Sequence, residues 1–166
     1  MLAFLGLADT AYAHHLQKPT ERLVAWAGCK APVVTSDEHS SLDSFYDGKR
    51  IYVGTAMDTP YEVWLMILLH ETSHCLQYQK YQDAMADTYA WDPMPWELDA
   101  DRQSAVLACG LGLDGPRLLH DLFVWAKEKY GYEGDESHGT LAQRIHMGDG
   151  ACVPAPVEAP VKRDAA

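Results

Sequence analysis

An apolar run that ends in two histidines constrains the fold more than any other stretch of this chain. Leu65-Met66-Ile67-Leu68-Leu69 leads directly into His70-Glu71-Thr72-Ser73-His74. On an α-helix, residues four apart lie one turn apart on the same face, with Cβ atoms about 6 Å apart. The apolar side chains before His70 fall on nearly all sides of such a helix. We therefore predict a deeply buried helix over residues 59–80.

The two histidines have the spacing of two ligands to one metal ion. Imidazole nitrogens placed in this way can both reach a tetrahedral zinc at about 2.0–2.1 Å. Glu71 lies one step round the helix, where its carboxylate reaches a water molecule on the metal more easily than the metal itself. The pattern therefore indicates a metal-assisted hydrolase in which Glu71 is the general base. The alternative is an ordinary amphipathic helix that carries two histidines.

A catalytic zinc site also needs a third protein ligand and an open position. The motif H-E-x-x-H-x-x-G-x-x-H is excluded, because Gln77 and Lys80 occupy its glycine and third-histidine positions. Glu97, which opens the next helical segment, is the best candidate instead. Asp101 lies one turn further along that segment, where it could accept a hydrogen bond from the far nitrogen of a ligating histidine.

Simpler explanations exist for each of these carboxylates. The dipole of the helix alone would favour Glu97 at a helix N-terminus. Asp101 could form a surface ion pair with Arg102 or Arg117. Asp99 points to another face of the helix, and we expect it to be a solvated charge.

The two motifs together resemble those of the gluzincins, the thermolysin-like zinc peptidases. That family carries H-E-x-x-H on one helix and E-x-x-x-D or E-x-x-A on a following one, and residues 70–74 and 97–101 match both. The chain length and a strand before the active helix resemble the short minigluzincins. His74-Cys75-Leu76-Gln77 resembles small bacterial and phage metallopeptidase domains with H-E-x-x-H-x-x-Q. The resemblance covers roughly residues 50–110.

The resemblance implies an α+β, zincin-like fold, with a small sheet packed on the active-site helix and the glutamate helix. It implies that zinc is the cofactor and that its ligands are His70, His74 and Glu97. It also implies that Glu71 is the base and that Asp101 orients a ligand.

A late segment carries candidates for stabilising the oxyanion of the reaction. Residues 137–145, Ser-His-Gly-Thr-Leu-Ala-Gln-Arg-Ile, resemble the S-H-P-x-x-x-x-R-I segment of several small gluzincins, with Gly139 in place of proline. The resemblance implies that His138 or Arg144 donates a hydrogen bond to the oxyanion. The alternative is a helix cap followed by a solvated arginine. Tyr89 and His120 are weaker candidates, and for each we favour packing of the ring in the core, with a polar group at its tip, over a catalytic role.

The rest of the chain reads as one α+β domain over residues 1–150, followed by a flexible Pro- and Ala-rich tail over 151–166. Residues 8–28 have a helical pattern that Pro19-Thr20 divides. Residues 31–54 indicate a small antiparallel sheet with a hairpin turn at Asp47-Gly48. Helical patterns follow at 96–109, 116–130 and 140–147. Residues 81–95 read as a connector whose acidic side chains form a solvated face, a rim for cationic substrates, or a calcium site.

Charge and hydropathy exclude several classes of partner. A net charge of −11 argues against nucleic acid and against an anionic membrane surface. No apolar run approaches the ~18 residues of a transmembrane helix. The apolar N-terminus lacks a preceding Lys or Arg and is interrupted by Asp9, so a first helix of the domain is favoured over a secretory signal. A cytoplasmic or virion-associated location is correspondingly favoured over secretion.

The four cysteines form no C-x-x-C pair, which argues against a cysteine zinc site or a redox motif. Cys75 and Cys109 lie on apolar helical patterns, and we expect them to be core thiols. Two disulfides are the alternative in an oxidising compartment.

The sequence predicts a zinc-dependent peptidase that acts on a peptide or protein substrate, with cell-wall peptides as one variant. An extended peptide would add beside the strand at residues 50–54. The alternative is a zinc-binding protein of the same fold that serves as an assembly part of a phage or secretion system without turnover. Glu71 argues against that alternative, because a purely structural site does not use a base. The oligomeric state stays open.

Overall fold

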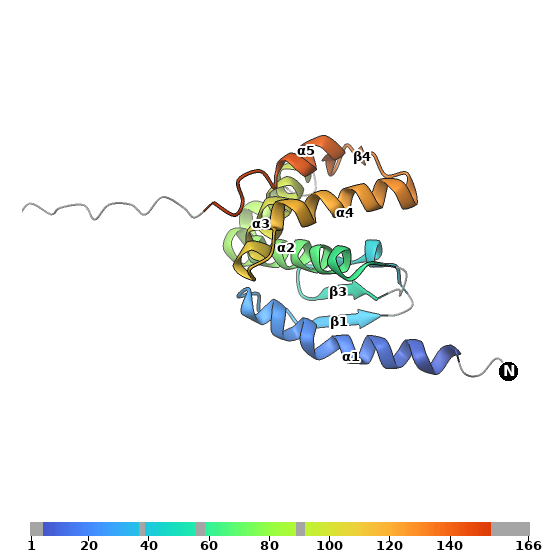
Figure 1. The fold of residues 1–166 in the computed structure, drawn as a ribbon. Coiled ribbons are helices and arrows are strands. Elements are labelled where there is room, and N and C mark those ends of the chain that lie inside the picture. The colour runs from blue at the N-terminus through green and yellow to red at the C-terminus, as the bar shows by residue number, and fades with distance from the viewer. Residues whose placement is uncertain (1–4, 37–38, 56–58, 89–91, 154–166) are drawn as a thin grey trace, which may run out of the picture.

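The chain has an α+β fold in which one long helix separates a small sheet from the helices that follow it in the chain (Figure 1). The computed structural model describes residues 5–36, 39–55, 59–88 and 92–153. The elements in chain order are α1 (Leu5–Trp26), β1 (Val33–Ser36), a 3₁₀ turn (Ser41–Asp43), β2 (Phe45–Tyr46), β3 (Ile51–Gly54), α2 (Tyr61–Thr88), α3 (Met94–Gly110), α4 (Gly115–Tyr130), β4 (Gly134–Asp135), β5 (Gly139–Thr140) and α5 (Leu141–His146).

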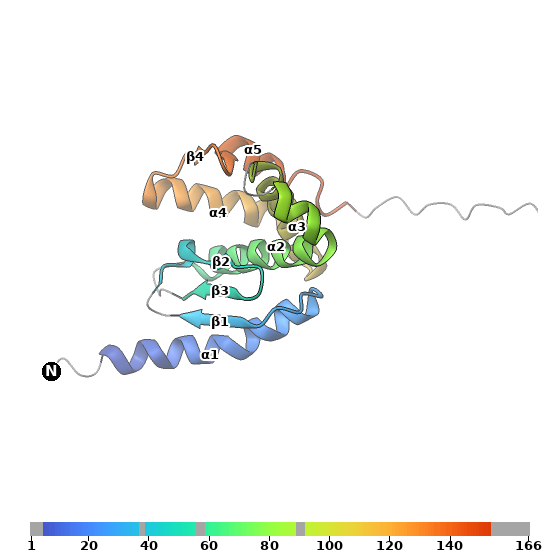
Figure 2. The ribbon, with the colours of Figure 1, turned by 180° about the vertical axis from the view of Figure 1, so that it is seen from behind.

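The elements are stacked in layers around α2. Helix α1 packs against β1, and strand β2 lies at the side of the sheet nearest α2 (Figure 2). Helices α3 and α4 cover the opposite side of α2, and α5 packs on α4. The helix that carries the two histidines is therefore enclosed between the sheet and the other helices.

The sheet is mixed, so the prediction of an antiparallel sheet over residues 31–54 is wrong for its first strand. The strand order is β1-β3-β2. β2 and β3 are antiparallel, with Phe45 opposite Tyr52, whereas β1 runs parallel to β3, with Val33 opposite Ile51. The hairpin brings β3 back beside β2, and β1 then pairs with the free edge of β3 through a crossover. The strand at residues 51–54 is consequently central, and β2 is an edge.

The hairpin turn at Asp47-Gly48 is confirmed. The Asp47 carboxylate accepts hydrogen bonds from the backbone N–H of Lys49 at 2.8 Å and of Arg50 at 2.6 Å. Gly48 has φ of 86°, which favours glycine at this corner. These side-chain bonds fix the position of the short edge strand β2.

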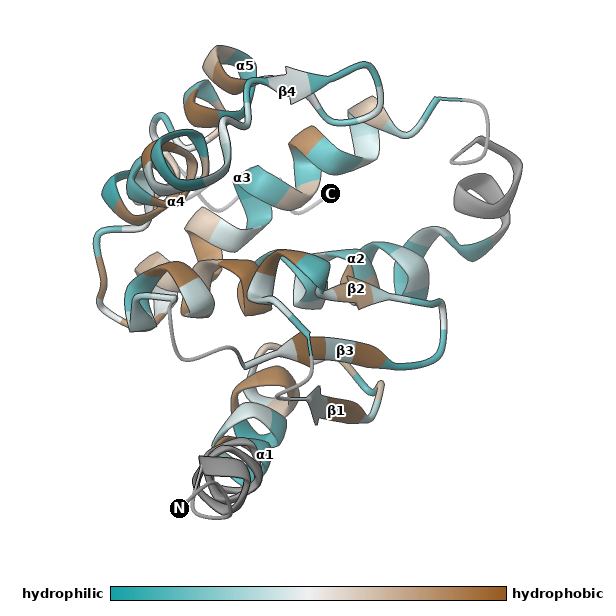
Figure 3. Cartoon of the chain, turned by 90° about the vertical axis from the view of Figure 1, so that its right-hand side faces the viewer, coloured by the Kyte–Doolittle hydropathy of each residue, from teal (hydrophilic) through white to brown (hydrophobic). Residues whose placement is uncertain are grey.

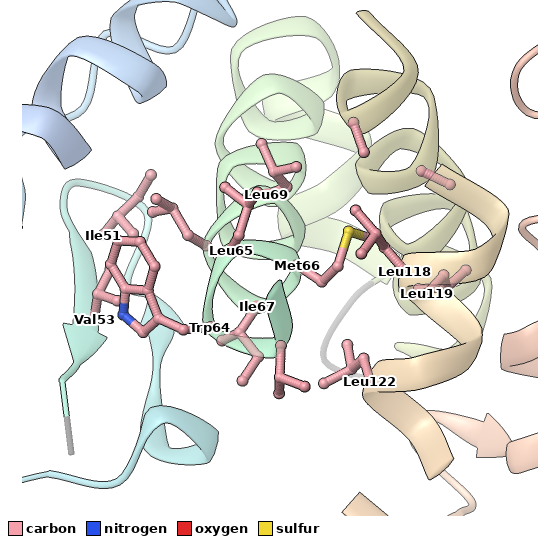
Figure 4. Close-up of a cluster of buried hydrophobic side chains, with 14 of the residues drawn as sticks. Ile51, Val53, Trp64, Leu65, Met66, Ile67, Leu69, Leu118, Leu119 and Leu122 are labelled. Carbon is pink, nitrogen blue, oxygen red and sulfur yellow. The ribbon is translucent and has the colours of Figure 1, made fainter. Parts of the chain in front are cut away.

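The first half of α2 is buried on all sides, as its apolar run predicts. Every residue from 63 to 75 is buried. Trp64 packs over Ile51 and Val53 of β3 on one side, while Met66 faces α4 on the other (Figure 4). The indole N–H of Trp64 also donates to the carbonyl oxygen of Gly54 at 3.2 Å. Burying each such side chain contributes about 1.5–3 kcal/mol. Figure 3 shows the hydrophobic stretch of α2 between β3 and the upper helices.

Helix α1 is continuous, so the predicted division at Pro19-Thr20 is wrong. Thr20 is buried within the helix, and its hydroxyl donates to the carbonyl oxygen of Leu16 at 2.6 Å. Gln17 fastens the helix to β1: its amide donates to the carbonyl of Val33 and accepts from the N–H of Thr35. Packing on the sheet therefore outweighs the hydrogen bond that the proline removes.

Helix α2 continues beyond its predicted end at residue 80 and runs to Thr88, with non-helical dihedral angles at Tyr81. The first part of the predicted connector is therefore helical, because the residues that break a helix, Pro93 and Pro95, come only later. Tyr89 and the side chains of Asp83 and Asp87 lie outside the described residues.

Two disulfides replace the predicted core thiols. Cys29 after α1 is bonded to Cys75 of α2, and Cys109 of α3 is bonded to Cys152. Cys152 falls within the predicted flexible tail, so the disulfide ties the first residues of that tail to the domain. Residues 154–166 lie outside the described part of the chain. A spacing pattern in the sequence does not reveal such pairs, because each joins elements far apart in the chain.

Within the described residues, no helix combines the length and the hydropathy needed to cross a bilayer.

Replacing both Cys29 and Cys75 by alanine is expected to lower the free energy of unfolding by about 4 kcal/mol, because the bond restricts the unfolded chain over a sequence separation of 46 residues. Chemical denaturation of the two proteins measures the difference. The matched control replaces Cys109 and Cys152, whose separation of 43 residues predicts nearly the same loss. Free thiols in the unreduced native protein would contradict both pairings.

Candidate metal centre

Three buried side chains from two helices converge on one point. His70 and His74 lie one turn apart on α2, and Glu97 lies in the first turn of α3. The Nε2 atoms of the two histidines are 3.1 Å apart. Glu97 Oε2 is 3.2 Å from His70 Nε2, and Oε1 is 3.3 Å from His74 Nε2. Among the described residues these three side chains form a group that could bind a metal ion.

The spacing of the two histidine nitrogens fits a small tetrahedral cation. Ligand atoms at 2.0–2.1 Å from a tetrahedral zinc are separated by about 3.3 Å, the edge of the tetrahedron. The two Nε2 atoms, 3.1 Å apart, lie near this value, and each carboxylate oxygen of Glu97 faces a different one of them, Oε2 towards His70 and Oε1 towards His74. The chemistry of the donors, two imidazoles and a carboxylate, suits the same class of metal.

Glu97 is kept ionised by its neighbours. Only 3% of the residue is exposed, and burial by itself would raise its pKa. Contacts with His70 and His74 outweigh burial and hold the pKa of Glu97 well below its usual range. The group therefore presents a carboxylate, the form that binds metals, at any ordinary pH.

His70 is held from behind by a buried carboxylate. Its Nδ1 lies 2.9 Å from Oδ1 of Asp101, although the contact is not aligned as a hydrogen bond. Asp101 is fully buried, so the alternative that it forms a surface ion pair is wrong. Burial would raise the pKa of Asp101, but His70 and Arg144 outweigh that effect and lower it. The sequence-based prediction that Asp101 stands behind a histidine agrees with this geometry.

Arg144 of α5 donates two hydrogen bonds to Asp101. Its Nε donates to Oδ2 at 2.7 Å and its Nη2 donates to Oδ1 at 2.9 Å. The remaining nitrogen, Nη1, donates to the hydroxyl of Tyr132 at 3.0 Å, and the guanidinium lies over the ring of Phe123. Each nitrogen of Arg144 thus has a protein partner. The alternative of a solvated arginine does not hold, and the observed contacts assign Arg144 to holding Asp101.

The pKa of His70 reflects these neighbours. Burial lowers it, but the carboxylates of Asp101 and Glu97 more than offset burial and raise the pKa of His70 from 6.5 to about 10. Without a metal, His70 therefore carries a proton at neutral pH. That proton compensates the two carboxylates in the position that a cation would otherwise occupy.

Glu71 lies in the wall of the adjoining cleft. The residue is buried, and burial raises the pKa of its carboxyl group. The backbone N–H of Tyr46 donates a hydrogen bond to the carboxylate, which acts in the opposite direction. Edge strand β2 therefore positions Glu71 beside the three converging side chains.

His138 approaches the same point from the opposite side. Its Nε2 is 3.8 Å from Oε2 of Glu97, while Nδ1 is 2.8 Å from Oδ1 of Asp135. The β4–β5 hairpin holds the pair, and Gly139 in that hairpin has φ of 85°. Proline cannot adopt this angle, which explains the departure from the S-H-P pattern. The His138 side chain is 41% exposed, so it borders the open side of the site.

Asp135 contributes to the site by holding His138, a role that the sequence analysis did not predict. Its carboxylate accepts from the backbone N–H of His138 at 2.9 Å as well as contacting the ring. Burial would raise the pKa of Asp135, but the hydroxyl of Ser137 and then these contacts with His138 outweigh burial and lower it. The available signal was an aspartate three residues before the histidine, between two glycines.

A cleft of about 680 Å³ gives access to the three converging side chains. The segment at β2 forms one wall with Ser44, Phe45 and Tyr46, and α4 contributes Leu122 and Phe123 to the other. His70, Glu71, His74, Glu97, His138 and Arg144 all line this cleft. His120 does not: it is exposed and contacts Asp121 at 3.3 Å.

The chain matches no protein-family model, no curated protein and no solved structure.

The protein is expected to bind one divalent ion per chain, and His70→Ala, His74→Ala or Glu97→Ala should each remove it. Elemental analysis after dialysis measures the content. Glu71→Gln is the matched control, because Glu71 is not one of the three converging groups and its variant should keep the metal. Equal metal content in wild type and His74→Ala would contradict the assignment.

Metal binding should release about one proton at pH 7, because His70 must give up the proton that its pKa of about 10 maintains. Calorimetry in buffers of different ionisation enthalpy counts the protons. The raised pKa also stabilises the metal-free fold: this contribution is complete below pH 6.5 and is lost as the pH rises through about 10. Binding that is independent of pH between 6 and 9 would be the contrary result.

Proposed function

We propose that this protein is a zinc-dependent peptidase with a zincin-like fold, which hydrolyses peptide bonds in its cleft. The observation that carries the proposal is the convergence of His70, His74 and Glu97 on one point, directly beside a buried carboxylate, Glu71, in an accessible cleft. Structural zinc sites use four protein ligands and are closed, whereas catalytic sites use three and stay open. The three ligand atoms and the cleft favour the second kind.

The residues around the site suit the steps of amide hydrolysis. A bound zinc ion would lower the pKa of a water molecule and polarise a carbonyl oxygen. Glu71 would take the proton of the attacking water and pass it to the leaving amine. Burial raises the pKa of Glu71, which brings it towards the range of a general base at neutral pH.

His138 would act on the opposite side of the scissile bond. Asp135 accepts from Nδ1 of His138, so Nε2 is the atom that faces the cleft. A protonated Nε2 could donate a hydrogen bond to the developing oxyanion. Arg144, whose nitrogens are engaged by Asp101 and Tyr132, would support the reaction indirectly by holding Asp101.

An extended peptide would bind along β2 rather than β3. β3 has a neighbour on both sides, whereas β2 has a free edge at the cleft. The backbone N–H of Asp47 donates to the carbonyl oxygen of Arg50 across the hairpin. In an antiparallel pair of strands, residues that are hydrogen-bonded to the partner strand alternate with residues that are not. The N–H and C=O of the neighbouring Tyr46 therefore point away from β3. The N–H is used by Glu71, which leaves the carbonyl for a substrate N–H.

The two disulfides support action in an oxidising compartment. Such bonds persist in secreted proteins, in the periplasm and on virion surfaces, and are rare in the cytosol. This favours secretion or a virion surface over the cytoplasmic location that the N-terminal sequence suggested.

Glu71→Gln is expected to retain bound zinc and to lose 10²- to 10⁴-fold in the rate of peptide cleavage, because the amide cannot accept the proton of water. Cleavage of a broad peptide library, followed by mass spectrometry, measures the rate. Asp121→Asn, outside the cleft, is the control and should cleave at the wild-type rate. Undiminished cleavage by Glu71→Gln would refute the mechanism. Zinc binding by a wild type that cleaves nothing would favour the assembly-protein alternative.

A further inference from the structure

Gln77 occupies a position that neither the ligand set nor the cleft accounts for. It lies on α2 three residues after His74, and only 1% of it is exposed. Its Oε1 is 3.0 Å from Nδ1 of His74. Its Nε2 donates to the carbonyl oxygen of Trp96 at 2.9 Å and to Oδ2 of Asp99 at 2.8 Å. Because this amide is fully buried and makes three polar contacts, its surroundings fix its orientation.

The orientation of this amide follows from its partners. A backbone carbonyl and a carboxylate only accept hydrogen bonds, so the NH₂ group of Gln77 must face Trp96 and Asp99. Its oxygen then faces His74. Because that oxygen only accepts, Nδ1 of His74 must carry a hydrogen, and in the neutral ring Nε2 then keeps its lone pair.

We propose that Gln77 is the positioning residue of His74: it holds the ring in the Nδ1–H tautomer and aims the Nε2 lone pair at the point where His70 and Glu97 converge. The role in metal binding rests on the proposed function, whereas the tautomer itself does not. Groups that fix a ligating histidine in this way typically change metal affinity 10- to 100-fold.

The same contacts join the two helices of the site. Trp96 and Asp99 flank Glu97 in the first turn of α3, and Gln103 donates to Asp99 from one turn further on. Asp99 is therefore not the solvated charge that the sequence suggested. Through Asp99 and Trp96, Gln77 sets the position of Glu97 relative to His74.

A carboxylate could not replace the amide of Gln77. The position requires a donor towards Asp99 and an acceptor towards His74 at once, and among side chains of this length only glutamine supplies both. A glutamate there would place two carboxylates about 3 Å apart, at the distance that Nε2 now spans to Asp99.

The test is ¹⁵N NMR of the histidine rings in the metal-free full chain at pH 8, combined with zinc affinity by chelator competition. Wild type should show His74 with the proton on Nδ1. Gln77→Met, which keeps the side-chain length but removes both polar atoms, should abolish that preference and weaken zinc binding 10- to 100-fold.

The matched control is Gln79→Met on the same helix. Gln79 bonds to the backbone of Gly28 and Lys30, away from the metal centre, so its loss should change stability without changing the His74 ring. If Gln77→Met does not fold, Gln77→Asn, which is one methylene too short to reach, serves in its place.

An unchanged His74 tautomer in the folded Gln77 variant overturns the inference, whatever the zinc affinity. If wild type shows the Nδ1–H tautomer and the variant loses it, but neither binds zinc, the positioning role stands and the peptidase proposal fails. The two ideas are thereby separated.

Discussion

The burial of polar side chains on α2 is the constraint on which the rest of the structure depends. The helix carries an apolar run into the centre of the domain and continues with histidines, a glutamate and hydroxyl groups that are equally buried. Buried polar groups are costly unless they are hydrogen-bonded or paired. Thr72 and Ser73 satisfy this requirement within the helix, by donating to carbonyls one turn back. The larger side chains need partners from other elements.

Those partners determine how the other helices pack. Asp101 and Glu97 bring α3 against one face of α2, and Arg144 brings α5 to Asp101. One chain of contacts thus runs from His70 through Asp101 and Arg144 to Tyr132, and a second runs from His74 through the amide of Gln77 to the carboxylate of Asp99. Buried ion pairs add little net stability but are costly to break, so such a chain favours a single arrangement of the helices.

The outcome is a preorganised site. The two histidine nitrogens already lie about one tetrahedron edge apart with Glu97 beside both, and in the absence of a metal the proton on His70 compensates the charge of the two carboxylates. The covalent bond between Cys75 and Cys29 fixes α2 immediately beside His74. On the open side, the hairpin that holds His138 and the edge strand that holds Glu71 face each other across the cleft. We regard the combination of rigidly held metal-binding side chains and an accessible cleft as the main physical support for a catalytic role.

Features that depend on neighbours along the chain could be predicted from the sequence. The apolar run and the spacing of His70 and His74 are local properties of one helix, and the hairpin at Asp47-Gly48 follows from its turn residues. Glu97 was the best candidate for the third ligand because it opens the next helical segment, and the structure brings the three groups together. Tertiary structure alone decided the parallel pairing of β1, the continuity of α1, both disulfides, and the partners Asp135 and Gln77. Each of these depends on contacts between segments, or on the direction in which a loop turns, and neither periodicity nor spacing encodes such information.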